Sequence, residues 1–273
     1  MAARDQGESG GSEPWWRPQT VAAGETLVCR LGPLSLQVHH GPGEWQVAFA
    51  QGDEREADAC LDLHLRRGGI EGDDYERFVS SAASERLSLG PMLADRPVVI
   101  RPRQAVYLLS GEETTLFLSS PLSLRLTVGE PAILLREVPM LRLSDTWFGP
   151  STRVGELCYA GKTHARHSLA DVPRRAHRAV TALHIRNEGN SPLPLDKVSL
   201  PVPFLSVYGA EDGSLWTQGA SLIRHSDSDM AVLKIDKAPP AEAGAVSLIS
   251  GPRQAPARGG IVRAFNVLFG DGR

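Results

Sequence analysis

Apolar and polar residues alternate in short runs along most of the chain. The two clearest runs are GPLSLQVHH (residues 32–40) and EWQVAFA (residues 44–50), which are separated by Gly-Pro-Gly. Every second residue in each run is apolar, and in an extended strand such residues lie on one face. Glycine and proline favour tight turns. The pattern therefore predicts a β-hairpin over residues 32–50.

Similar runs predict strands along the rest of the sequence. They cover residues 61–65, 98–101, 105–109, 114–118, 122–128, 156–160, 180–187, 197–202, 205–208, 221–224, 230–235, 246–249 and 261–269. The Ser-Ser-Pro sequence at residues 119–121 predicts a break between two of these strands. The 27 glycines and 20 prolines are enough to separate many short strands by turns. Helical signals are confined to residues 53–59 and 73–81, where we expect at most a few turns.

Many short strands with turns between them are typical of β-sandwiches and barrels. We therefore expect an all-β protein with two β-sandwich lobes, immunoglobulin-like or jelly-roll-like, and few short helices. Residues 15–140 would form the N-terminal lobe and residues 141–273 the C-terminal lobe, and the lobes would meet near residues 138–150. Residues 1–14 are polar and are predicted to be a disordered leader.

Composition narrows the classes of partner and cofactor. The net charge of -3 provides no overall attraction to nucleic acid. No apolar run approaches the roughly 20 residues of a membrane-spanning helix, and the N-terminus lacks a secretory signal. We therefore expect a cytoplasmic protein without direct membrane insertion. Cys29, Cys60 and Cys158 are far apart, which predicts reduced, mostly buried thiols rather than disulfides or a zinc site. We expect no metal and no cofactor.

Two apparent motifs fail on spacing or context. The sequence GELCYAGKT (residues 155–163) ends like a phosphate-binding loop, but five residues separate Gly155 from Gly161 where that loop needs four. Its middle residues also alternate like a strand, whereas phosphate loops consist of small residues. The GESGG sequence near the N-terminus matches a nucleophile elbow, but it lies in the polar leader without the strand and helix that an elbow requires. We predict neither nucleotide binding nor a catalytic serine.

The segment LSDTWFGPSTRVGELCYAGKTHARHSL (residues 143–169) holds the strongest candidate for a binding site. Its candidate residues are Asp145, Trp147, Phe148, Glu156, Tyr159, Lys162 and Arg166. The basic character continues through His164, His167, Arg174, Arg175, His177 and Arg178. Cations beside aromatic rings suit a phosphate, a carboxylate or an acidic protein surface. In the alternative interpretation the aromatic residues join the two lobes, the basic run is solvated, and Asp145 caps a turn.

This segment resembles an uncharacterised prokaryotic family, domain of unknown function 432 (DUF432). Its members carry a sequence similar to SDTWFG, followed by one similar to GELCYA and by a basic stretch. The likeness is most specific over residues 144–166, continues more loosely over residues 184–216, and is one of general strand style in the N-terminal half. The family has no established activity. Some members are encoded near small mechanosensitive channels, so the resemblance implies an association with such a channel.

We expect a non-enzymatic, cytosolic binding or interaction protein. In this hypothesis the aromatic candidates provide apolar contact, Lys162 and Arg166 provide charge, and Glu156 orients one of these cations. The partner would be a protein, and the resemblance implies a membrane channel. The sequence leaves the oligomeric state and the strand order open.

Two alternatives come from other functional classes. The first is a small-molecule hydrolase or isomerase that acts on an anionic substrate in an inter-lobe cleft, with Glu156 or Asp145 as general base and Arg166 or Lys162 holding the substrate. This alternative is favoured if Glu156 is buried against Arg166 and faces a pocket, and it fails if both side chains point to bulk water. The second is a carbohydrate-binding module, which requires at least two coplanar, exposed rings among its aromatic candidates. These candidates are Trp45, Trp147, Tyr208 and Trp216.

Overall fold

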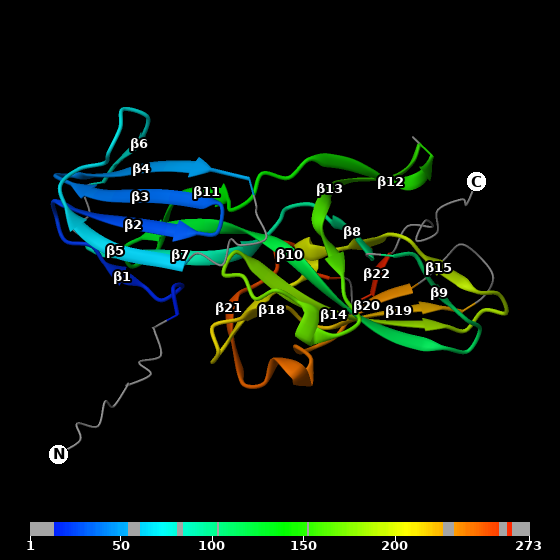
Figure 1. Ribbon diagram of the computed structural model, residues 1–273. Coiled ribbons are helices and arrows are strands. Elements are labelled where there is room, and N and C mark those ends of the chain that lie inside the picture. The colour runs from blue at the N-terminus through cyan, green and yellow to red at the C-terminus, as the bar shows by residue number, and fades with distance from the viewer. Residues whose placement is uncertain are drawn as a thin grey trace, which may run out of the picture.

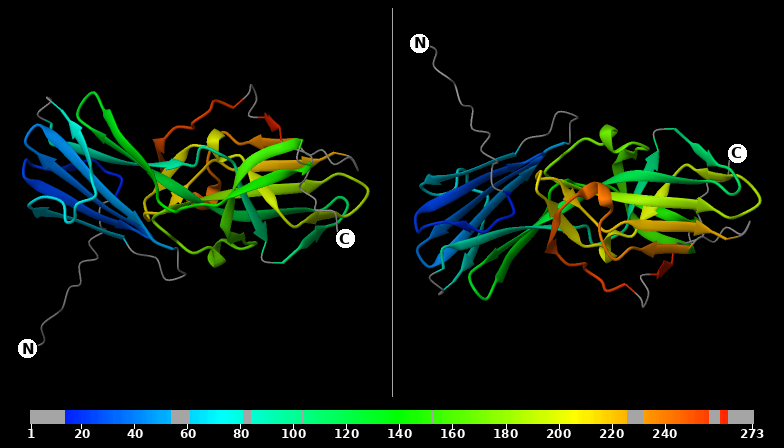
Figure 2. Two further views of the ribbon diagram at one scale, coloured as in Figure 1. Left: turned by 90° about the horizontal axis from the view of Figure 1, so that it is seen from above. Right: turned by 90° about the horizontal axis from the view of Figure 1, so that it is seen from below.

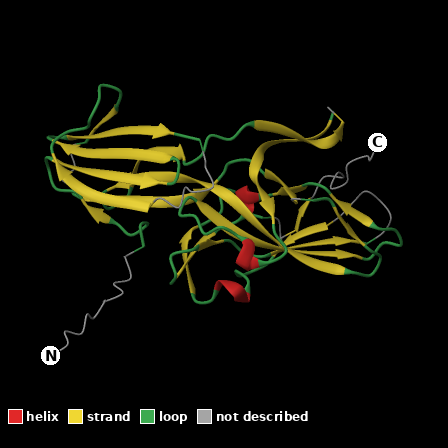
Figure 3. Ribbon diagram, in the orientation of Figure 1, coloured by secondary structure: helices red, strands yellow, loops and turns green. Residues whose placement is uncertain are grey.

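The computed structural model describes residues 14–53, 61–80, 84–102, 104–151, 153–225, 232–256 and 261–263, without the side chains of Pro150, Lys162, Thr163 and residues 261–263. These residues form 22 strands and three 3₁₀-helices of three residues each, namely η1 (Leu169–Asp171), η2 (Val202–Phe204) and η3 (Ala241–Ala243) (Figure 3). The predicted all-β class is confirmed. None of the helices in the described part of the chain is long and apolar enough to cross a membrane. The predicted leader lies outside the described residues except for Pro14.

A five-stranded antiparallel sheet occupies one end of the elongated molecule (Figure 1). Its strands are β2 (Glu25–Leu31), β3 (Leu34–Gly41), β4 (Glu44–Gln51), β5 (Leu61–Arg67) and β6 (Glu76–Val79), in the order β5-β2-β3-β4-β6. The predicted hairpin is confirmed, since β3 pairs with β4 from Leu34↔Gln51 to Gly41↔Glu44. Its apolar face is buried because Leu36, Val38 and Trp45 point into the core.

The helical turns expected at residues 73–81 are wrong. Residues 76–79 instead form the edge strand β6, which pairs with β4. The four residues alternate between half-buried and exposed, and Phe78 packs against the core, so a two-residue period outweighs the helical signal. The other helical prediction, at residues 53–59, lies outside the described residues except for Asp53.

The long strand β10 (Glu113–Val128) joins the two ends of the molecule. Residues 113–121 pair with β14 (Arg178–Asn187), whereas residues 122–128 pair with β7 (Arg86–Leu93) and β11 (Ile133–Pro139). The predicted break at residues 119–121 is therefore wrong, because the strand continues and only its partners change. Pro121 lies at that change, where a residue without a backbone N–H is tolerated more easily than inside a ladder.

The 11-stranded sheet that contains β10 runs in the order β1-β7-β10-β14-β18-β17-β21. Four more strands extend it, because β11 pairs with β10, β19 with β14, β20 with β19, and β22 with β20. The further strands of this sheet are β1 (Gln19–Thr20), β17 (Val207–Ala210), β18 (Leu215–Trp216), β19 (Ala220–Arg224), β20 (Val232–Ile235), β21 (Val246–Ser250) and β22 (Ile261–Arg263).

Two smaller sheets complete the fold. One has the order β12-β13-β8-β16, formed by β12 (Asp145–Ser151), β13 (Val154–Ala165), β8 (Val98–Pro102) and β16 (Val198–Leu200). The other pairs β15 (Leu193–Leu195) with β9 (Val106–Leu108). Figure 1 shows β12 and β13 in the part of the molecule away from the five-stranded sheet, and the view from above in Figure 2 agrees.

One hydrophobic cluster runs through both ends of the molecule and includes Leu36, Leu124, Phe148 and Leu183. A smaller second cluster contains Phe117, Val180 and Trp216. Several ladders cross the expected lobe boundary near residue 140, because β8 pairs with β13 and β16, β9 with β15, and β10 with β14. The division into lobes at that residue stays a prediction.

Candidate interaction surface on the β12–β13 hairpin

The predicted site residues lie mainly on the hairpin formed by β12 and β13. The strands pair antiparallel, with Asp145 opposite Tyr159, Trp147 opposite Leu157, and Phe148 opposite Glu156. Successive residues of a strand point to opposite faces, so this register divides the predicted cluster between two faces. Asp145, Trp147 and Tyr159 share the outer face, and Phe148 and Glu156 share the inner face.

A charged and aromatic group occupies the outer face. Arg96 donates to the Asp145 carboxylate at 3.1 Å, and its guanidinium lies 5.3 Å from the centre of the Tyr159 ring. The Tyr159 hydroxyl donates to Asp95 Oδ1 at 3.0 Å. Burial, together with this hydrogen bond to Asp95, raises the pKa of Tyr159. The phenol is therefore a neutral donor at neutral pH rather than a catalytic base.

An exposed apolar patch lies beside this group. Trp147, Val154 and Leu157 are 46%, 47% and 44% exposed. The Trp147 indole donates from Nε1 to the Ser151 carbonyl at 2.8 Å, which holds the ring over the end of the hairpin. A Cβ atom at Gly155 would lie 2.8 Å from the same Nε1, so the ring fits there only because residue 155 is glycine. The hairpin thus presents a fixed aromatic side chain to the surroundings.

The inner face is a packed polar contact. Phe148 is buried, with the Lys197 ammonium 5.5 Å from its ring centre, and Ser199 donates to Glu156 Oε1 at 3.1 Å. Burial raises the pKa of Glu156, and hydrogen bonds from Ser199 and Cys158 oppose that rise in part. Burial, followed by the nearby Glu156 charge, raises the pKa of the Cys158 thiol to about 12. The thiol is therefore protonated and unreactive at neutral pH.

Among the described residues, the outer edge of β12 carries backbone groups that no other strand pairs with. Ala160 N–H donates to the Ser144 carbonyl, so Ser144 and Ala160 form a hydrogen-bonded pair. Hydrogen-bonded and non-bonded pairs alternate along an antiparallel ladder. Asp145 and Trp147 therefore belong to non-bonded pairs and direct their N–H and C=O groups away from β13. Tyr159 N–H accordingly donates to Pro97 on the opposite side, and among the described residues β12 pairs with no second strand.

Of the two predicted cations, Arg166 lies away from this group. Arg166 follows the end of β13 and exchanges both backbone hydrogen bonds with Phe117. At about 3.3 Å per residue, a strand places it on the order of 30 Å along the chain from Glu156. Glu156 hydrogen-bonds to Ser199 and not to Arg166, so the contact that would favour the hydrolase or isomerase alternative is not formed. The Lys162 side chain lies outside the described residues.

A family model described as "Protein of unknown function (DUF432)" matches residues 15–269. This chain belongs to the DUF432 family. The match covers nearly the whole chain, whereas the sequence resemblance was specific only around the hairpin. No curated protein and no solved structure matches the chain.

The other chemistries considered for this DUF432 protein find no matching geometry. The GKT sequence lies within the continuous strand β13 rather than in a loop between a strand and a helix. Among the described residues no group of three His, Cys, Asp or Glu side chains could hold a metal ion. Trp45 and Trp216 are buried, which removes two of the four rings proposed for a carbohydrate platform. Cys29 and Cys158 are buried free thiols, and Cys60 lies outside the described residues.

Sequence reasoning missed four residues that complete the hairpin of this DUF432 protein. Asp95 and Arg96 complete the outer face, and Lys197 and Ser199 complete the inner face. Asp95 and Arg96 precede β8, whereas Lys197 directly precedes β16 and Ser199 lies within it. The paired residues are about 40 to 60 positions apart along the chain. Their only local signal is a charged pair just before the strand at residues 98–102. A small cavity of about 250 Å³ also borders Tyr159, below the roughly 300–1,000 Å³ of typical ligand pockets.

Proposed function

We propose that this protein is a non-enzymatic interaction protein that binds an extended segment of a protein partner along the edge of β12. The observation that carries the proposal is the outward direction of the Asp145 and Trp147 backbone groups beside exposed Trp147 and Leu157. An added strand would pair with those backbone groups, and its apolar side chains would cover the exposed rings and methyl groups.

Edge strands of soluble proteins are usually protected by charges, bulges or a covering segment. On β12 the charge of Asp145 is engaged by Arg96, and the bulge and Pro150 come only at the end of the strand. An edge left open in this way favours regulated pairing with another chain. The partner segment would be extended, with apolar residues at every second position.

The partner implied by the family resemblance is a small mechanosensitive channel, met from its cytoplasmic side. In this proposal the protein is cytoplasmic. The two ends of the molecule act as β-sandwich lobes, and they support the hairpin, which contacts the partner. The predicted aromatic role is assigned to Trp147, and the predicted charged role to Arg96 and Asp145 rather than to Arg166.

A titration of purified, detergent-solubilised small mechanosensitive channel with labelled protein tests this function. Trp147→Ser should weaken binding at least about tenfold, because a central tryptophan contributes strongly to an interface. The matched control is Tyr107→Ser, since Tyr107 is a 67% exposed aromatic residue on β9. Equal affinities for the wild type and Trp147→Ser, or equal losses in both variants, would contradict the proposed surface.

A second pair of variants separates strand addition from side-chain contact. Asp145→Ala and Asp145→Pro both remove the carboxylate that binds Arg96, but only Asp145→Pro removes the outward N–H. Strand addition predicts that the proline variant binds several-fold more weakly than the alanine variant. Equal affinity of the two variants would mean that β12 does not pair with the partner.

A further inference from the structure

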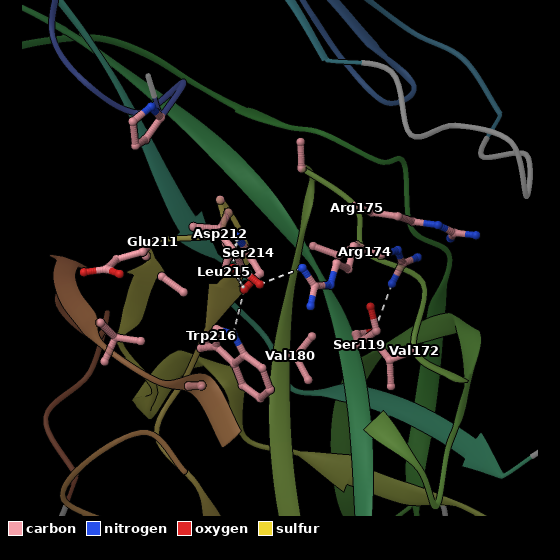
Figure 4. Close-up of a pocket in the computed structure, with 18 of the residues that line it drawn as sticks. Ser119, Val172, Arg174, Arg175, Val180, Glu211, Asp212, Ser214, Leu215 and Trp216 are labelled. Carbon is pink, nitrogen blue, oxygen red and sulfur yellow. Dashed lines mark hydrogen bonds and ion pairs between the residues drawn. The ribbon is translucent and has the colours of Figure 1, made fainter. Parts of the chain in front are cut away.

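A broad, open pocket of about 1620 Å³ lies on a part of the surface that includes no residue of β12 or β13 (Figure 4). Four segments form most of it: residues 14–17 near the N-terminus, residues 169–180 from η1 into β14, the β17–β18 hairpin, and residues 242–247. Leu61 and Ser119 complete its lining. Its residues therefore come together only through the tertiary fold. The pocket is larger than the roughly 300–1,000 Å³ of most small-molecule sites.

The floor of this pocket is apolar. Val172, Val180, Trp216 and Ala243 line it and belong to the small second hydrophobic cluster. The Trp216 indole donates from Nε1 to Ser214 Oγ at 2.9 Å, so its polar atom is satisfied while the ring faces the floor. An apolar part of a ligand would therefore find a surface of aliphatic and aromatic atoms.

Four arginines line the pocket, namely Arg17, Arg174, Arg175 and Arg178. Arg174 is fixed by Asp212 at 2.7 Å, and Asp212 is held in turn by the backbone and hydroxyl of Ser214. Burial by itself would raise the pKa of Asp212, but the Ser214 hydrogen bonds and the Arg174 charge outweigh it and lower the pKa. The Asp212 carboxylate is therefore charged at neutral pH and pairs with the Arg174 guanidinium.

The charges of the pocket are unevenly distributed. Figure 4 places Glu211 on the opposite side of the pocket from Arg174 and Arg175, with Trp216 and Val180 between them. A guanidinium has five N–H donors in a planar fork, so Arg174 can bind an anion with donors other than the one that contacts Asp212. The charges therefore orient a bound anion toward the arginine side.

We propose that this pocket binds an organic anion, in which a carboxylate, sulfonate or phosphate group is joined to an apolar ring or chain. The acidic group binds on the side of Arg174 and Arg175, and the apolar part covers Val180 and Trp216. The proposal rests on the placement of charge over an apolar floor. It is independent of the partner proposed for β12.

Two fluorescent dyes test the proposal with the full chain. 1-Anilinonaphthalene-8-sulfonate carries an anionic group on an aromatic system, and N-phenyl-1-naphthylamine has the same rings without the sulfonate. The wild type should bind the sulfonate at a single site at least about tenfold more tightly than the neutral dye, because charge-assisted hydrogen bonds are strong. Added salt should weaken binding of the sulfonate and leave the neutral dye unaffected.

Three variants locate the site. Arg174→Gln and Arg175→Gln should each weaken sulfonate binding about tenfold, whereas Glu211→Gln should bind at least as tightly as the wild type. Arg175→Gln keeps the Arg174–Asp212 ion pair, so it remains informative if Arg174→Gln fails to fold. Equal affinity for both dyes would overturn the proposal. Unchanged sulfonate binding in the folded arginine variants, or an equal loss in Glu211→Gln, would also overturn it.

Discussion

At the scale of single residues, neighbours in the hairpin have different environments because a strand turns each successive side chain to the other face. Trp147 is 46% exposed, whereas the next residue, Phe148, is buried. The sequence analysis placed both residues in one site because they are adjacent along the chain. It did not take into account that their side chains lie on opposite faces of the sheet. Asp145, Trp147 and Tyr159 could be grouped from sequence. The contacts of Asp145 and Tyr159 with Arg96 could not, since they depend on the pairing of β8 with β13.

Glu156→Gln should stabilise the protein at neutral pH. Burial raises the folded-state pKa of Glu156, so the folded state holds its proton more tightly than the unfolded state. The favourable contribution of this group is complete below its ordinary pKa of 4.5 and is lost as the pH rises through the folded pKa. Urea unfolding at several pH values should show the variant ahead at pH 7, with a gap that narrows toward pH 4.5. A gap independent of pH, or a less stable variant at pH 7, would contradict this assignment.

At the scale of elements, alternation located most strands but not their partners. The runs at residues 32–50, 98–101 and 180–187 became strands close to the predicted bounds. β7 and β12 were missed because each contains Gly-Pro, which indicates a turn in sequence but lies within a paired strand here. Pairing order depends on contacts between distant segments, and periodicity carries no information about them.

One side chain fixes the end of β14. Asn187 is fully buried and donates to the carbonyls of Leu108, Leu109 and Ser191. Asn187→Asp removes these donors and places a carboxylate among carbonyl oxygens, so it should cost roughly 3–5 kcal/mol of unfolding free energy. Asn190→Asp changes an exposed position in the same turn and should cost less, because a carboxylate there stays in contact with water. Chemical denaturation measures both, and similar losses would show that Asn187 does not hold this corner.

At the scale of the whole molecule, the five-stranded sheet contacts the other end through the turn between β2 and β3. Gly32 lies in this turn with φ +56°, directly against the ring of His177, the residue before β14. Gly32→Ala should cost roughly 2–4 kcal/mol, because it adds both a strained backbone and a Cβ that overlaps the ring. Gly43→Ala has a similar φ of +71° but open space around it, and should cost about 1 kcal/mol. Equal costs would mean that the two ends do not press together at His177.

The ladders that cross residue 140 predict that a fragment of residues 141–273 does not fold by itself. It would lack β8, β9 and β10, which pair with β13, β15, β16 and β14 in the intact chain. The unpaired backbone groups and uncovered apolar faces would leave it unfolded. Amide NMR spectra of the fragment should show little dispersion. A cooperative thermal transition would instead establish an independent lobe, a question that the sequence alone leaves open.

Amide-resolved hydrogen exchange along β12 tests the proposed function most directly. In the free protein the N–H groups of Thr146 and Phe148 face β13 and should exchange slowly, whereas those of Asp145 and Trp147 face outward and should exchange fast. Binding of the partner channel should slow exchange at Asp145 and Trp147 by at least about tenfold, because an added strand would bond to them. If these two amides are already protected in the free protein, or keep their rates in a saturated complex, the edge of β12 is not the binding site.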